Sequence, residues 1–233
     1  YDGNEPYISA HSFEGVFGDD GLFVNEFSFT RVDGTPIENW DVGEYIVGLT
    51  DDISGNMENY NIMFKKEYIF TITPRIIESV TFSGYRNLYY TGESLNSRIT
   101  ASFNISLGVD GFAQLIFYKN NEIVEECLDA GDYIVKAVIN DDNFILTKEQ
   151  SVSFTVSKIQ QSTPLVLADI EDTTYQTQQI PLSAVGGDGS GDIVYEVISG
   201  KASTQGNILY INGTGDISIR AKKLESLNYY EQY

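Results

Sequence analysis

Hydrophobic and polar residues alternate along this chain with the period of β-strands, most clearly over residues 132–139. Tyr133, Val135, Ala137 and Ile139 share one face of an extended segment at period two. Other apolar and β-branched segments between turn residues are also expected to be strands: 75–82, 99–105, 114–118, 123–127 and 152–156. A hairpin turn is expected at 119–122. No run of ten or more residues has a capped helical pattern, so the sequence predicts a nearly all-β chain.

This strand pattern occurs three times. The segment 43–47 (Gly-Glu-Tyr-Ile-Val) returns at 131–135 and, more loosely, at 215–219, and an asparagine–aromatic pair follows each copy: Asn59-Tyr60, Asn143-Phe144 and Asn228-Tyr229. A fixed period indicates an array of small domains. We therefore expect three tandem Ig-like antiparallel β-sandwich domains in an elongated array, at residues 1–74, 75–158 and 159–233.

The first and third copies are shorter than the second. Residues 1–3 align with 90–92, so the first copy has no counterpart of the entry strand at 75–82. The third copy has no counterpart of the closing strand at 152–157. A sandwich without an edge strand exposes unpaired backbone groups, and we therefore expect this chain to be a piece of a longer protein.

Composition narrows the classes of partner. The 233 residues include 34 acidic and 14 basic ones, giving a formal net charge of −20. Nucleic-acid binding needs cations that neutralise phosphate, so no nucleic acid is expected as a partner. Docking to an anionic membrane surface is disfavoured for the same reason. The sequence has no transmembrane run, and we expect no direct membrane insertion.

The sequence contains few of the residues on which catalytic sites are usually built. His11 and Cys127 are the only histidine and the only cysteine, so sites built from several His and Cys ligands are excluded by supply. No pattern singles out a pair of carboxylates for acid–base work. We expect no enzymatic activity and no required cofactor. Cys127 is either a small buried hydrophobe or a reactive or intermolecular thiol.

Calcium is the best chemical hypothesis for the acidic residues. Asp51, Asp52, Asp141 and Asp142 occupy related loops after the repeated strand. Ca²⁺ takes six to eight oxygen ligands from carboxylates, carbonyls and water, so a structural calcium ion there would stiffen neighbouring domains. Aspartate also favours β-turns for reasons of local hydrogen bonding. Both interpretations are open at this point.

Several of these motifs are similar to known repeats. The Tyr-Asp-Gly start, the Gly-x-Tyr-x-Val strand, the asparagine–aromatic pair and the Phe-Thr-Ile-Thr-Pro ending at 70–74 resemble the "mostly β, glycine-rich" (MBG/YDG) repeats of large bacterial surface and adhesin-like proteins. Residues 182–192, 193–197 and 213–221 resemble bacterial Ig-like repeats. The resemblance implies an Ig-like sandwich, an extracellular, cell-surface or wall-attached location, and a stalk or adhesive role. It implies no catalytic residues.

Two functions follow as expectations. The first is a non-catalytic extracellular stalk that projects other domains from the cell surface, with neighbouring repeats of the same longer chain as its partners. The short, extended joints at 73–75 and 157–159, which lack flexible Gly/Ser linkers, favour it. The alternative is a binding module in which loops of one repeat hold a host or surface glycan or protein, for which tyrosine is well suited.

Overall fold

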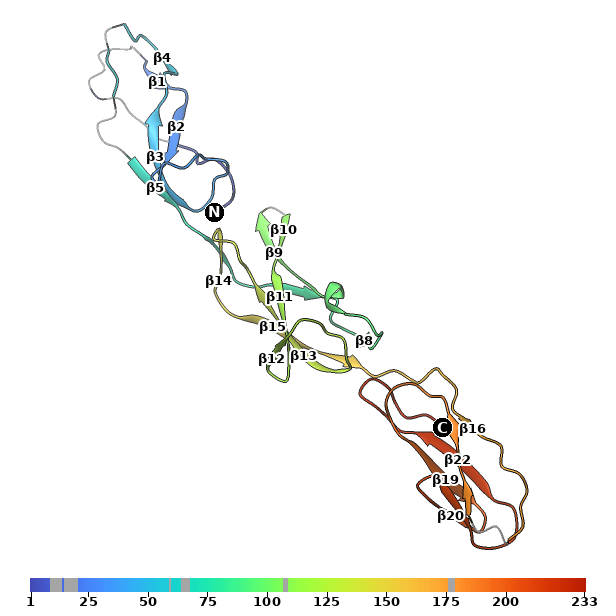
Figure 1. The fold of residues 1–233 in the computed structure, drawn as a ribbon. Helices are drawn as coiled ribbons and strands as arrows, with labels where there is room; N and C mark the ends of the chain where they lie inside the picture. Colours follow the sequence, from blue (N-terminus) through green and yellow to red (C-terminus); the bar gives the residue numbers. More distant parts are fainter. Residues whose placement is uncertain (9–13, 15–20, 59, 64–67, 107–108, 176–178) are drawn as a thin grey trace. The chain divides into compact units, whose positions relative to one another are not determined.

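A computed structural model describes residues 1–8, 14, 21–58, 60–63, 68–106, 109–175 and 179–233 (Figure 1). His11 and Asn59 lie outside the described residues. Contacts between residues divide the chain into two compact units. Unit 1 consists of Tyr1–Thr81, Ala101–Gln114 and Ala137–Gln150. Unit 2 consists of Phe82–Thr100, Leu115–Lys136 and Ser151–Tyr233.

The regular secondary structure of the described residues is almost entirely β-strand, and its one helical segment is the short 3-10 turn η1 at Asn96–Arg98. The first ten strands are β1 (Phe23–Val24), β2 (Phe27–Arg31), β3 (Gly43–Leu49), β4 (Ile53–Ser54), β5 (Tyr68–Ile72), β6 (Arg75–Ile77), β7 (Thr81–Ser83), β8 (Leu88–Tyr89), β9 (Thr100–Ser106) and β10 (Val109–Phe112). The next six are β11 (Gln114–Lys119), β12 (Glu122–Val124), β13 (Gly131–Val138), β14 (Phe144–Leu146), β15 (Gln150–Ser157) and β16 (Val166–Leu167). The last six are β17 (Gln179–Pro181), β18 (Ala184–Val185), β19 (Ile193–Ser199), β20 (Ala202–Gln205), β21 (Ile208–Ile211) and β22 (Ser218–Lys223). In the part of the chain that the structure describes, no helix has the length and apolar character of a membrane span.

Unit 1 contains a three-stranded antiparallel sheet in the order β2-β3-β5 (Figure 1). Alternation along β3 buries Tyr45 and Val47 and exposes Glu44, as expected of a strand with one face on a core. Tyr45 stacks on Phe70 of β5 with ring centroids 5.3 Å apart, and Trp40 lies 5.2 Å from Tyr45. Aromatic packing thus forms the core beside this sheet.

A second group of strands in unit 1 is built around β14 and β6, which pair in parallel. β9 pairs with β10 in antiparallel fashion. Phe103 of β9 lies edge-on to Phe144 of β14 at 5.3 Å. The buried apolar residues of this group are Ile77, Val80, Ala101, Phe103 and Ala137.

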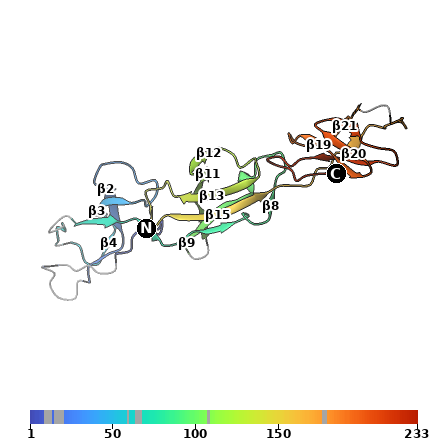
Figure 2. The same ribbon diagram turned by 90° about the horizontal axis from the view of Figure 1, so that it is seen from below.

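Unit 2 contains strands of the five-stranded sheet β12-β11-β13-β15-β8 (Figure 2). The β11–β12 hairpin turns at Asn120 and Asn121, which both have positive φ, of 53° and 66°. Such a two-residue turn matches the twist of the strands, and it confirms the hairpin expected at 119–122. One buried cluster covers the sheet: Leu88, Leu95, Ile99, Phe117, Cys127, Tyr133, Val135, Phe154 and Val156.

The remaining strands of unit 2 form the antiparallel pairs β19–β22 and β16–β18 and the sheet β17-β21-β20. Leu182, Leu209 and Ala221 are their buried apolar residues. The glycine-rich loop 186–191 is held by the Asp188 carboxylate, which accepts hydrogen bonds from the N–H and hydroxyl groups of Ser162 and Thr163. These bonds, with that of the Thr163 hydroxyl the largest cause, lower the pKa of Asp188 to about 2.

The all-β prediction is confirmed, and the separate sheets are compatible with β-sandwiches. The division into three tandem Ig-like domains stays a prediction. The pairing is not purely antiparallel, because β14–β6 and β15–β8 are parallel. Neither pair is joined by a hairpin, and parallel strands need a long connection of the kind that separates these strands in sequence.

Candidate functional site: two asparagine contacts

A buried tyrosine with a cation beside it lies at the start of β3 in unit 1. The Tyr45 hydroxyl donates to the Asp41 carbonyl at 2.6 Å and accepts from Arg31 Nη1 at 3.0 Å. Arg31 Nη2 also donates to the Val42 carbonyl at 3.2 Å. The guanidinium carbon lies 5.1 Å from the ring centre of Tyr45, where a cation interacts favourably with an aromatic face. These bonds fix the backbone at residues 41 and 42.

Unit 2 contains the same arrangement at the start of β13. The Tyr133 hydroxyl donates to the Asp129 carbonyl at 2.8 Å and accepts from Lys119 Nζ at 3.2 Å. Lys119 Nζ donates to the Ala130 carbonyl at 3.2 Å and lies 4.8 Å from the centre of the Tyr133 ring. A tyrosine that bonds to the backbone a few residues upstream is a feature of Ig-like corners. The two units therefore fix equivalent backbone segments with equivalent bonds.

The glycine between the aspartate and the tyrosine leaves room for the cation. A Cβ on Gly43 would lie 2.7 Å from Arg31 Nη2, and a Cβ on Gly131 would lie 3.1 Å from Lys119 Cε. Both glycines also have positive φ, of 156° and 143°, a conformation that side chains disfavour. The repeated Gly-x-Tyr motif is thus explained by this close approach.

Asn143 binds the fixed segment of unit 1. Its Oδ1 accepts from the Val42 N–H at 2.8 Å, and its Nδ2 donates to Asp41 Oδ1 at 2.9 Å. Its backbone carbonyl accepts from the N–H of Arg75 at 2.8 Å, where β6 begins beside β14. One asparagine therefore joins three chain segments that are distant in the sequence.

Asn228 binds the fixed segment of unit 2 in the same way. Its Oδ1 accepts from the Ala130 N–H at 2.8 Å, and its Nδ2 donates to Asp129 Oδ1 at 2.9 Å. Its backbone carbonyl accepts from the N–H of Ile159 at 3.0 Å. We call the sets around Asn143 and Asn228 the first and second asparagine contacts.

The partners fix the orientation of each amide. A backbone N–H can only donate, so it must face Oδ1, and a carboxylate can only accept, so it must face Nδ2. Aspartate would lack the donor, and alanine would lack both groups. Each contact therefore selects asparagine by chemistry as well as by size.

An aromatic pair lies next to each asparagine contact. Tyr1 meets the ring of Phe144 edge-on, with centroids 5.5 Å apart, and Tyr90 meets Tyr229 at the same distance. Burial raises the pKa of Tyr1, and the carboxylates of Asp41 and Asp141 raise it further. Edge-on packing adds to the stabilisation from buried area. In each case, therefore, the asparagine side chain and the aromatic ring that follows it contact the same region of the protein.

These contacts join distant segments of the same chain, and they place no nucleophile or acid–base pair at a cleft. The asparagine–aromatic pairs were recognised in the sequence, but their partners were not. The missed signals were Asp41 and Asp129, each two residues before the motif glycine, together with the cations Arg31 and Lys119. The third pair is not described structurally, because Asn59 lies outside the described residues.

Of the four calcium candidates, Asp141 makes a local turn bond, and Asp52 bonds to a residue 27 positions away. Asp52 Oδ1 accepts from Asn25 Nδ2 at 2.9 Å, and Asp141 Oδ1 accepts from the Asn143 N–H at 2.9 Å. The carbonyl of Asp51 accepts from the N–H of Ile53, and Asp142 is exposed in the neighbouring loop. Within the described residues, no three His, Cys, Asp or Glu side chains gather in a group that could hold a metal ion. Structural calcium stays a prediction.

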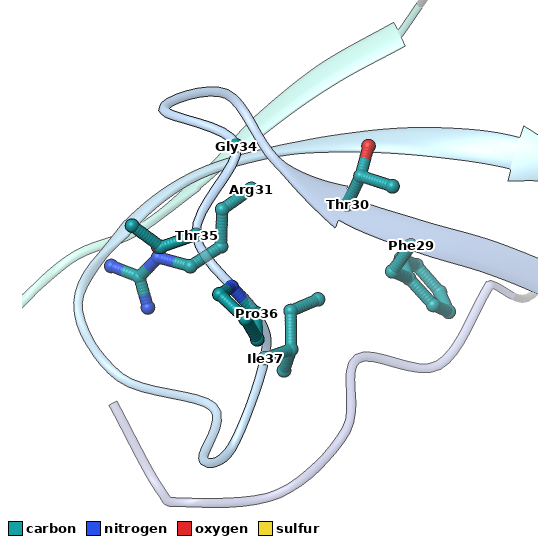
Figure 3. Close-up of a pocket in the computed structure, with 7 residues that line it drawn as sticks. All are labelled: Phe29, Thr30, Arg31, Gly34, Thr35, Pro36 and Ile37. Carbon is teal, nitrogen blue, oxygen red and sulfur yellow. The ribbon is translucent and has the colours of Figure 1, made fainter.

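Unit 1 also has a pocket of about 460 Å³ beside the end of β2. Its lining residues, drawn in Figure 3, are Phe29, Thr30, Arg31, Gly34, Thr35, Pro36 and Ile37. Pro36 and Ile37 lie next to each other in the loop that follows β2 (Figure 3). Arg31 donates a hydrogen bond to the Tyr45 hydroxyl, and Thr35 donates to the Asp33 carboxylate from its N–H and its hydroxyl. The pocket is therefore partly lined by apolar side chains, and its Arg31 and Thr35 side chains already hydrogen-bond within the protein.

The single cysteine is part of the core. Cys127 has no exposed surface and belongs to the buried cluster of unit 2. Burial raises the pKa of its thiol to about 11, so the reactive thiolate is disfavoured in the folded protein. Of the two interpretations of Cys127, the structure favours the buried hydrophobe.

Comparisons of the chain with protein-family models, curated proteins and solved structures found no match.

Proposed function

We propose that this protein is a non-catalytic extracellular spacer of a large bacterial surface protein, in which successive repeats are held in fixed orientation to project other domains. The observation that carries the proposal is the pair of matching asparagine contacts. Each joins segments about 100 residues apart in sequence, namely 101 and 102 positions for Asn143 and 98 and 99 for Asn228.

Both contacts lie where the sequence predicts a joint between repeats. Arg75 and Ile159, which bond to the asparagine carbonyls, are the first residues of the second and third predicted repeats. The joints are short and lack Gly/Ser-rich linkers, which limits their bending. Two amide bonds, one backbone bond and an aromatic pair at the same point restrict it further. Restricted bending is the property that a spacer needs.

The proposal is tested by the distribution of orientations at the joints. Pairs of spin labels placed on exposed strand positions on either side of residues 75 and 159 would report distances by pulsed electron paramagnetic resonance. We expect narrow distributions in the unmodified chain and clearly broader ones in the chain with Asn143→Ala and Asn228→Ala. Asn140→Ala is the matched control, because Asn140 is exposed and its side chain bonds to the exposed side chain of Gln114. Distributions equally broad in all three proteins would contradict the spacer function.

The pocket of Figure 3 supports the alternative function, a binding module for a surface glycan or protein. Phe29, Pro36 and Ile37 would provide the apolar contact area that such a ligand needs. Binding on a glycan array that is lost in Ile37→Asp, and kept in an exposed control such as Val32→Asp, would favour this alternative. Absence of binding on the array and in pull-downs would favour the spacer.

A further inference from the structure

Two strands of unit 1 that are distant in the sequence run side by side in the same direction. β6 and β14 pair in parallel, in the register Arg75↔Phe144, Ile76↔Ile145 and Ile77↔Leu146. At one end of the pair, the N–H of Arg75 donates to the Asn143 carbonyl at 2.8 Å. At the other end, the N–H of Thr147 donates to the Ile77 carbonyl at 3.3 Å. The pair is therefore hydrogen-bonded at both of its ends.

The order of the strands along the chain decides how tension acts on this pair. The chain enters β6 from Pro74 and leaves β14 through residues 147–149 into β15. Tension along the chain therefore pulls β6 at its N-terminal end and β14 at its C-terminal end. Because the two strands are parallel, these pulls slide one strand past the other and load the bonds of the pair together. This direction of loading is shear, whereas two pulls at the same end would peel the strands apart bond by bond.

The same backbone bonds recur at the start of the third predicted repeat. Ile159 and Tyr229 form a parallel bridge. The N–H of Ile159 donates to the Asn228 carbonyl at 3.0 Å, as that of Arg75 donates to the Asn143 carbonyl. The N–H of Tyr230 in turn donates to the Ile159 carbonyl at 2.9 Å. The first residue of a predicted repeat is thus bonded in parallel to a segment late in that repeat in two places.

Asn143 gives β14 a second attachment. Its side chain bonds to the Val42 N–H and to the Asp41 carboxylate in the first asparagine contact. The start of β14 is therefore joined to the segment before β3 as well as to β6. Tension that reaches residues 41–42 has a route to β14 through these side-chain bonds, besides the route through Pro74 and β6.

We propose that the β6–β14 pair is a clamp that bears tension along the chain, so that the protein carries mechanical load. This role rests on the proposed spacer function, because a protein that connects two points is subject to tension between them. The direction of the two strands and their order in the chain support it. A spacer that only sets orientation needs no particular direction of loading, so the clamp adds a function to the spacer.

The test applies force to the full chain through two pairs of attachment points that differ at one position. Thr73→Cys with Lys148→Cys places the handles at opposite ends of the pair and loads it in shear. Thr73→Cys with Asp142→Cys places both handles at the same end and peels it. All three native side chains are exposed, whereas Cys127 is buried and does not compete for the handles. Forced unfolding reports the rate of unfolding rather than the equilibrium stability, so the two variants are compared by unfolding force at one loading rate in an optical trap.

We expect the force that opens the pair to be about twofold higher in shear than in peeling, because the evenly spaced bonds of a parallel pair share the load. Denaturant unfolding without force is the control, and it should give the same midpoint for both cysteine variants. Equal unfolding forces in the two directions, or a higher force in peeling, would overturn the clamp.

The clamp and the spacer function fail separately. Narrow spin-label distance distributions together with equal unfolding forces would leave a spacer without a clamp. Broad distributions together with a higher force in shear would contradict the spacer and leave the directional resistance of the β6–β14 pair in place.

Discussion

Substitution of Asn143 by alanine is the most direct perturbation of the first asparagine contact. It removes the acceptor for the Val42 N–H and the donor to the Asp41 carboxylate, at 2.8 and 2.9 Å. A neutral bond contributes about 0.5–1.5 kcal/mol and a bond to a charged group about 1.5–3 kcal/mol. Because these groups are half-buried, water replaces part of the lost bonding. We therefore expect a loss of about 2 kcal/mol in the free energy of unfolding of unit 1.

The assay is denaturant unfolding followed by the fluorescence of Trp40. Asn140→Ala, which removes an exposed asparagine three residues away, is expected to cost less than about 0.5 kcal/mol. Asn143→Asp keeps the shape but faces the Asp41 carboxylate with a second carboxylate. This variant should be less stable than Asn143→Ala, and added salt should narrow the gap because it screens the repulsion. If Asn143→Ala cost no more than Asn140→Ala, the amide would not hold the segments together and the reasoning would fail.

Three further outcomes are expected in unit 2. Tyr133→Phe removes a buried hydroxyl and should lower the free energy of unfolding by about 1–3 kcal/mol, whereas Tyr89→Phe, at an exposed ring, should leave it nearly unchanged in the same denaturant assay. The pKa of Asp188 is lowered to about 2, so the stabilisation by its carboxylate is complete above about pH 4 and is lost as the pH falls from about 4 to 2. Asp188→Asn should therefore lose less stability than the unmodified chain across that pH range. An equal loss in both proteins would contradict this. Cys127 should react with a thiol reagent only when unit 2 unfolds, so labelling in native buffer at the rate of a free thiol would refute its burial.

The strands were largely predictable because their signal is local. Residues 132–139 were expected to be a strand on alternation alone, and β13 covers Gly131–Val138. The single entry strand expected at 75–82 is instead divided into β6 and β7. The two halves pair with different partners, β14 and β9. That choice of partner is a tertiary effect, which local periodicity does not contain.

The asparagine contacts could be recognised only as a repeated motif. The sequence shows that an aromatic residue follows each asparagine, but it does not show what Asn143 binds. Its partners Val42 and Asp41 are 101 and 102 positions away. Turn propensity, which does act locally, explains the Asp141 side chain, whose carboxylate bonds two residues ahead.

The third copy of the strand motif differs from the other two at the residues that take part in the asparagine contacts. It keeps the motif glycine at Gly215 but has Gly213 where the other copies have aspartate, and Ile217 where they have tyrosine. In this copy β22 pairs with β19 and buries Ala221, but it begins at Ser218, whereas β3 and β13 begin at the motif glycine itself. Where the aspartate and the tyrosine are replaced, the residues next to the motif glycine are therefore not part of a strand. Aspartate and tyrosine occur together in the two copies that bind Asn143 and Asn228, where the aspartate carboxylate accepts from the amide and the tyrosine fixes the backbone beside it.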